Sequence, residues 1–265
     1  MRTLKKYVVL YFCFIKNSIM AQMEYRINFI ISMCIQLAYM GIKLTYVVVL
    51  YHADIAINGF SPDEMMIMIG TYSALSGVFV SFFLLNFSAL PELIKSGSLD
   101  SYIVKPVSLQ FMVTLRRVDL AFATVSVIVG GAMVGIGWYR AGVTFSLINV
   151  LGFLGFTFWG LFLTYSLFLI PNIISFWTVS SRGLGQFVNQ LWDFNNMPMT
   201  IYSNSVKFIG TFIIPVFLIT NTGGLFILRK LSPLLMFWAI FSPILLFLFC
   251  RLLWKKAIRH YVSVN

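Results

Sequence analysis

Long runs of hydrophobic residues follow one another along the whole chain, separated by short polar segments. A run of about 18 apolar residues or more predicts a helix that crosses a membrane. The pattern predicts six such spans: about Asn28 to Tyr51, Met65 to Leu90, Leu120 to Tyr139, Phe145 to Trp177, Phe208 to Leu228, and Leu234 to Trp254. The expected fold class is therefore an all-α membrane protein with six transmembrane helices.

The first 27 residues have a different pattern, in which cations interrupt the apolar positions. On a helix, the cations Arg2, Lys5, Lys6 and Lys16 fall on one arc, and Leu4, Tyr7, Tyr11, Phe14 and Ile15 fall outside it. This predicts an amphipathic helix at the membrane surface, with its apolar face in the lipid edge. A plain cytoplasmic tail is the alternative. The chain then divides into an interfacial helix (1–27), a six-span region (28–254) and a tail (255–265), all in one transmembrane domain.

The polar segment 179–207 allows two interpretations. Arg182 is typical of a cytoplasmic turn, and residues 208–228 would then form a simple fifth span. Alternatively, the segment is itself a polar membrane helix, and residues 205–228 dip in and out of the outer side as a re-entrant hairpin broken near Pro215. Such non-helical backbone is tolerated only when it is buried in protein or lines a cavity. We favour the simple span and keep the hairpin as the alternative.

Composition supports a membrane protein with no sizeable soluble domain. Only 10% of the 265 residues are charged and 60% are hydrophobic, whereas soluble domains carry about 25% charged residues. The net charge of +11 needs no nucleic-acid partner, because lysine and arginine collect in cytoplasmic loops. With the N-terminus inside, 15 of the 19 cations are cytoplasmic; Arg140, Arg229 and Lys230 lie outside, and Lys43 lies within a span. Both termini are therefore expected in the cytoplasm.

The sequence contains no recognisable motif for catalysis or for cofactor binding. It has no G-x-x-x-x-G-K-[ST] phosphate loop, no Ser/His/Asp set and no paired carboxylates in a plausible cleft. Its three cysteines and two histidines are isolated in sequence, so neither a disulfide framework nor a metal site is expected. We expect no cofactor and no enzyme activity.

Few polar features lie within the spans. Lys43 is expected to extend outward to the membrane surface, with a role in a substrate path as the alternative. Asp119 is expected to pair with Arg116 and Arg117 rather than relay protons. Gly131 and Gly135 form a G-x-x-x-G motif, with Gly130 and Gly137 beside them, that favours close packing within the protomer, or alternatively a subunit interface. A group of polar residues suits either a membrane–water surface or a conduit wall: Gln186, Asn189, Asp193, Asn195 and Asn196.

The most polar loop between two spans carries the most specific motif. The stretch "ELIKSGSLDSYIVKPVSLQF" resembles the loop between the second and third spans of bacterial ABC-transporter permeases of the type-2 exporter class, where G-x-L-D-x-x-[IL]-x-[KR]-P-[VI] recurs. The matching residues are Gly97, Leu99, Asp100, Ile103, Lys105, Pro106 and Val107. Weaker matches are "YRINF" before the first span, "SFW" at Phe176 and Trp177, "IIPV" at Pro215, and the basic aromatic tail; "TNTGG" after Pro215 departs from the family pattern.

The resemblance implies a permease subunit in a bacterial cell membrane. In this class the loop docks on a separate ATPase subunit, and a second permease, related or identical, completes the transporter. The expected docking residues are Glu92, Leu93, Ile94, Gly97, Leu99, Asp100, Lys105 and Pro106. Pro91 is expected to open a short helix and Gly97 to close it, with Leu93 and Ile94 facing the partner.

The aromatic spans favour export of a hydrophobic or amphipathic substrate, such as a drug, lipid or peptide. Two other functions stay open. One is a non-transporting scaffold or sensor, and the other is an ion-coupled carrier.

Overall fold

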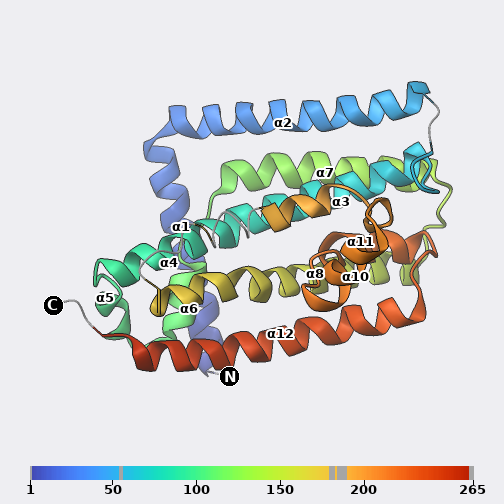
Figure 1. Ribbon diagram of the computed structural model, residues 1–265. Helices are drawn as coiled ribbons and strands as arrows, with labels where there is room; N and C mark the ends of the chain where they lie inside the picture. Colours follow the sequence, from blue (N-terminus) through green and yellow to red (C-terminus); the bar gives the residue numbers. More distant parts are fainter. Residues whose placement is uncertain (1, 54–55, 179–182, 184–189, 263–265) are drawn as a thin grey trace.

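The computed structural model describes residues 2–53, 56–178, 183 and 190–262. In these residues the protein is helical and contains no β-strand. Helices long and apolar enough to cross a membrane run alongside one another (Figure 1). They are α2 (Arg26–Ala53), α3 (Pro62–Phe79) continued by α4 (Leu85–Lys95), α7 (Leu120–Arg140), α8 (Leu147–Ile173), and α12 (Pro233–His260). The expected all-α membrane fold is confirmed.

The bundle has two ends with different contents. At one end, which we call the α1 end, lie α1 (Arg2–Glu24), the short helices α5 (Asp100–Ile103) and α6 (Leu109–Leu115), and the end of α12 (Figure 1). The opposite end carries the α2–α3, α7–α8 and α11–α12 connections. Helix α1 lies across the bundle rather than along it, as expected for an interfacial helix. Helix α12 continues to His260, so the predicted tail from residue 255 is mostly helical.

Helices α3 and α4 form one long element that is interrupted by a π-turn at Val80–Leu84. Pro91 lies inside α4 and does not begin a new helix there. The prediction that Pro91 opens a separate loop helix is therefore wrong. The second span continues without a break to Lys95, because the apolar side chains before and after Pro91 keep packing against the core.

Close packing of α3 against α7 depends on small residues. A Cβ atom on Gly130 would lie 2.7 Å from both the Ala74 nitrogen and the Gly70 carbonyl oxygen. Gly131 and Gly135 face outward, since a Cβ atom on either would meet nothing within 4 Å. Close packing within the protomer is therefore made by the flanking Gly130 and Gly137, and the expectation is wrong for Gly131 and Gly135 themselves.

The segment after residue 200 is a hairpin that enters and leaves at the same end of the bundle. It comprises α10 (Asn204–Phe208), a π-turn (Ile209–Ile213) and α11 (Leu218–Ile227), with a bend of 103° between its two arms. The Asn58 amide donates to the Thr200 carbonyl at 3.2 Å, and Lys230 donates to the Gly59 carbonyl at 2.8 Å. Both ends of the hairpin therefore meet the α2–α3 turn. The simple fifth span is wrong, and the re-entrant alternative describes this segment.

The hairpin reaches the middle of the bundle. Gly160, near the midpoint of α8, packs directly against the backbone of Ile219 at the start of α11. Before the hairpin, the chain passes from Trp177, which contacts His260 at the α1 end, to Thr200 at the opposite end. Trp177 and Thr200 therefore lie at opposite ends of the bundle, and residues 208–228 do not form the predicted fifth span. Lys207 consequently belongs with the cations of the opposite end, not with those of the α1 end.

Candidate functional site

The loop after α4 has a defined shape rather than an open one. Gly97 adopts φ +68°, a left-handed conformation that favours glycine. Its N–H donates to the Ile94 carbonyl at 3.3 Å, and the Leu99 N–H donates to the Leu93 carbonyl at 3.1 Å. Leu99 is fully buried. The prediction that Gly97 closes the helix is confirmed, and Leu99 holds the loop to the bundle from inside.

The exposed apolar residues of the loop are not those that we predicted from the sequence. Leu93 and Ile94 are partly buried against the hydrophobic core. Ile103 and Val104 are exposed instead, Val104 to 83%. Ile103 ends α5 and Val104 follows it, and both have polar neighbours at Ser101 and Lys105. Two adjacent exposed aliphatic side chains on a fixed loop form a contact surface that the motif alone did not identify.

Tyr102 is the centre of the polar contacts beneath this surface. Its ring is buried, and the Arg116 guanidinium donates a hydrogen bond to its hydroxyl. The Lys105 ammonium and the Arg116 guanidinium both lie 5.2 Å from its ring centroid. Asp100 interacts with Tyr261 after α12; burial first, and then this carboxylate, raises the pKa of the Tyr261 hydroxyl. The loop is thus tied both to the start of the third span and to the C-terminal segment.

Helix α1 holds the return arm of the loop. The Lys6 ammonium donates to the Pro106 carbonyl at 2.6 Å, and the Ser108 N–H donates to the Tyr7 hydroxyl at 2.9 Å. Phe111 of α6 is surrounded by three α1 rings, with centroid distances of 4.9 Å to Tyr7, 6.4 Å to Tyr11 and 6.0 Å to Phe14. The expectation that these rings face lipid is wrong, because they pack against α6 of the same chain.

A groove lies directly beside the loop. It has a volume of about 360 Å³ and is bounded by α4 on one side and by the ends of α8 and α12 on the other. Pro91, Ile94 and Lys95 form the first wall; Trp177, His260 and Tyr261 form the second. Of the predicted docking residues, Glu92 and Lys105 are exposed, as is Pro106, whereas Gly97 is buried like Leu99. The predicted docking residues therefore lie together, some of them on the surface of the loop and others buried beneath it.

Asp119 does not form the expected ion pair. Its carboxylate caps α7, accepting the backbone N–H groups of Ala121 at 3.1 Å and Phe122 at 3.5 Å. The two ion pairs found in the described part of the chain join Asp63 to Arg140 and Glu64 to Lys230, both at the opposite end. Ser61 also forms a capping box with Glu64 at the start of α3.

Lys43 turns toward the protein interior instead of extending to the surface. Its ammonium donates to the Ser73 hydroxyl at 3.2 Å and lies 4.3 Å from the Tyr72 ring centroid. The end of α2 remote from α1, at Ala53, is ten residues away, roughly 15 Å at the rise of an α-helix. The expectation of an outward side chain is therefore wrong. An ionisable group held inside a membrane bundle is a candidate functional residue.

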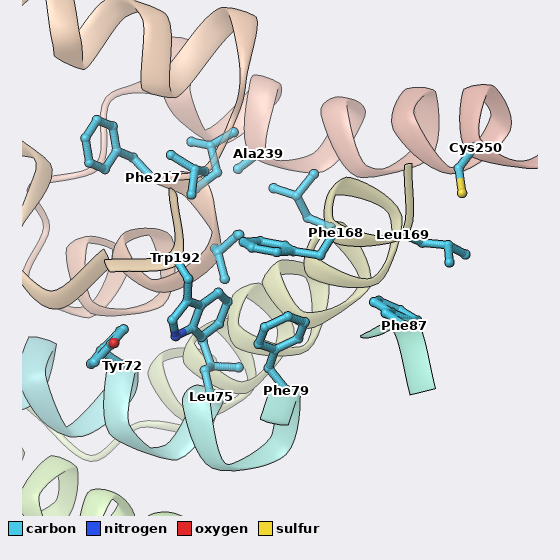
Figure 2. Close-up of a cluster of buried hydrophobic side chains, with 14 of the residues drawn as sticks. Tyr72, Leu75, Phe79, Phe87, Phe168, Leu169, Trp192, Phe217, Ala239 and Cys250 are labelled. Carbon is cyan, nitrogen blue, oxygen red and sulfur yellow. The ribbon is translucent and has the colours of Figure 1, made fainter. Parts of the chain in front are cut away.

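The polar passage before the hairpin packs next to this lysine. Figure 2 shows Trp192 between Tyr72 and Phe79 of α3 and Phe168 of α8. The Trp192 indole donates to Ser76 at 3.1 Å and stacks on Phe79 at 4.5 Å. These contacts place the next residue, Asp193, within electrostatic range of both Lys43 and Tyr72. Asp193 is itself exposed.

Amide side chains fasten this passage to the hairpin. The Thr220 hydroxyl donates to the Asn195 amide oxygen at 3.0 Å, and the Met199 N–H donates to the Asn221 amide oxygen at 2.9 Å. Asn196 is half-buried. Gln186 and Asn189, which were predicted for the same group, lie outside the described residues. Lys43 was missed as a member of this group because it comes from a different span.

Comparison with known protein families gives a match over most of the chain. A family model described as "ABC-2 family transporter protein" matches residues 37–265. No curated protein and no solved structure matches the chain. Across the described residues, no group of histidine, cysteine, aspartate or glutamate side chains is arranged to hold a metal ion.

Proposed function

This chain belongs to the ABC-2 transporter family and is the membrane component of a transporter. We propose that a separate ATPase subunit binds the loop of residues 91–106 and drives transport through it. The family implies association with an ABC ATPase. The chain itself has no phosphate-binding loop, so ATP must be bound elsewhere.

The observation that carries the proposal is the fixed apolar pair Ile103–Val104 at the α1 end. Gly97 and Leu99 set the shape of the loop from below, and Lys6 and Tyr7 of α1 hold its return arm. A rigid projection binds with less loss of conformational entropy than a mobile one, and it can transmit force to the spans. Lys105 follows the pair directly, and Asp100 lies in the same short helix as Ile103.

The distribution of cations supports a cytoplasmic α1 end. Described cations gather on α1, the 95–117 segment and the end of α12, whereas Arg140, Lys207, Arg229 and Lys230 lie at the opposite end. Positive residues favour the cytoplasmic side. The proposed orientation therefore places both termini and the ATPase-docking loop in the cytoplasm of a bacterial cell.

Lys43 and the neighbouring residues Tyr72, Trp192 and Asp193, which we call the Lys43 cluster, support a conduit for an amphipathic substrate. Lys43 and Asp193 offer opposite charges, and the buried rings of Tyr72 and Trp192 pack beside them. Export of a drug, lipid or peptide past this cluster requires a second permease, identical or related, to complete the conduit wall. An ion-coupled carrier or a non-transporting scaffold would be the outcome if transport proved independent of ATP or absent.

The direct test is replacement of the apolar pair by Ile103→Asp with Val104→Asp. An unpaired charge placed in an interface costs several kcal/mol, so ATPase capture by the tagged permease should fall about a hundredfold or more, with normal membrane levels of the permease. The matched control is Leu4→Asp, because Leu4 is 72% exposed at the same end and does not line the groove beside the loop. Unchanged ATPase capture by the double variant, or an equal loss in the control, would contradict docking through this loop.

A further inference from the structure

A second hollow surface of the α1 end lies between α1 and the segment that leads into α7. It consists of two adjoining cavities of about 360 and 410 Å³ along one face of α1. Ser18, Ala21 and Arg117 line both cavities, so the two form one continuous groove. Volumes of this size are typical of small-molecule binding sites.

The first cavity is cationic. Lys105, Arg116 and Arg117 line it, together with the polar side chains of Asn17 and Ser18. None of the three cations forms an ion pair within the described residues. Three positive charges around one hollow repel one another, and a bound anion would relieve that repulsion. The Arg117 guanidinium makes no hydrogen bond to another described residue, so its donors are available.

The surface of the second cavity is mainly apolar, although Gln22, Asn28 and Ser32 also line it. Phe29 of α2, Leu85 of α4 and Ala121 of α7 contribute to its walls. Asp119 also lines it, but its carboxylate is engaged by the backbone amides at the start of α7. This part of the groove therefore suits a hydrocarbon chain better than a second charged group.

We propose that this α1 groove binds an anionic phospholipid, with the headgroup phosphate at Arg116 and Arg117 and an acyl chain along Phe29 and Leu85. Arginine forms paired hydrogen bonds to phosphate oxygens, and basic residues at the membrane surface favour anionic lipid. The groove joins a cationic cavity to an apolar one at the membrane surface. An anionic phospholipid has the matching arrangement, with a charged headgroup joined to apolar acyl chains. A soluble phosphate compound would occupy the cationic hollow alone.

The site is separate from the docking pair and can be tested without an ATPase. The full-length permease in neutral detergent is titrated with phosphatidylglycerol, with phosphatidylcholine of the same chains, or with glycerol phosphate, and lipid adducts are counted by native mass spectrometry. Phosphatidylglycerol should bind at least about fivefold more tightly than phosphatidylcholine, since one surface cation contributes about that factor. Glycerol phosphate should not displace it at equal concentration.

Two variants test the groove, one through its charge and the other through its shape. Arg117→Gln keeps the backbone hydrogen bonds with Asn86 and should weaken phosphatidylglycerol binding about fivefold. Ala21→Trp fills the junction of the cavities without changing charge and should also weaken it. Arg259→Gln removes an exposed arginine at the same end that lines neither cavity and should change nothing.

Three results would overturn the proposal. They are equal binding of the two lipids, wild-type binding by both groove variants, or displacement by glycerol phosphate, which would assign the site to a soluble anion. If Arg117→Gln lowers the melting temperature, Ala21→Trp still decides the matter. Loss of lipid binding with normal ATPase capture, or the reverse, distinguishes this site from the docking loop.

Discussion

The amide of Asn58 donates a hydrogen bond to the carbonyl of Thr200, joining two turns that are 142 residues apart in sequence. Because Asn58 follows α2 directly, this contact places the start of the hairpin at the end of the bundle opposite α1.

Membrane topology follows from that contact. In a background with Cys13, Cys34 and Cys250 replaced, single cysteines at Asn58 and Asn204 should react with an impermeant reagent added outside the cell. A cysteine at Ser98 should react only after the cells are opened, because it lies at the α1 end. Labelling of position 204 only from inside would restore a simple span across residues 208–228 and contradict the hairpin.

Neighbouring glycines of α7 provide a stability test. Gly130→Ala places a methyl group 2.7 Å from the backbone of α3, and overpacking of this kind typically costs about 1–3 kcal/mol. Gly131→Ala, one residue later, meets nothing within 4 Å and should leave stability unchanged or slightly increased. The melting temperatures of the two purified variants should therefore differ clearly. Equal melting would show that α3 and α7 do not pack through Gly130.

The attachment of α1 depends on Phe111. Phe111→Ala removes three ring contacts, each worth about 0.5–1.5 kcal/mol beyond buried area. Amide hydrogen exchange in residues 4–18 should become at least about tenfold faster, while exchange in α8 stays unchanged. Phe12→Ala, on the exposed side of the same helix, is the control. Unaltered exchange in the Phe111 variant would mean that other contacts hold α1.

Lys43 should affect transport more than folding. Lys43→Met removes the charge but keeps an unbranched apolar side chain, so the melting temperature should fall little. Substrate-stimulated ATP hydrolysis by the assembled transporter should fall about tenfold if a charge-assisted contact to substrate is lost. Ser73→Ala removes only the hydrogen-bond partner of Lys43 and should have a smaller effect. Full transport by Lys43→Met would exclude the lysine from the conduit.

Hydrophobic periodicity predicted the long helices well, and it failed where the backbone changes direction inside the apolar region. The predicted third span, Leu120 to Tyr139, differs from α7 by one residue. Residues 208–228 are as apolar as a true span, and a hydropathy average does not detect the 103° bend near Pro215. The polar residues before them were ambiguous because the Trp192 indole and the Asn195 amide oxygen are hydrogen-bonded to Ser76 of α3 and Thr220 of α11.

The candidate site was located in the right segment, but the orientation of its side chains was not predictable. The motif at Gly97 carries local conformational information, since a glycine at positive φ closes α4 whatever surrounds it. Whether Leu93 or Val104 faces outward depends on how α4 packs on α8 and how α1 packs on α6. Lys43 likewise turns inward only because Ser73 and Tyr72 from α3 receive it.

The π-turn at Val80–Leu84 controls the direction in which the loop points. A π-turn accommodates one extra residue, and here the Ser81 carbonyl accepts the Asp119 N–H at 3.0 Å. If the same residues formed a regular α-helix without this turn, α4 and everything attached to its end would be rotated by about 100° around the helix axis. Val104 would then swing to a different side of the molecule. The direction in which the loop points is thus set by the π-turn inside the bilayer, about three helical turns away from the loop itself.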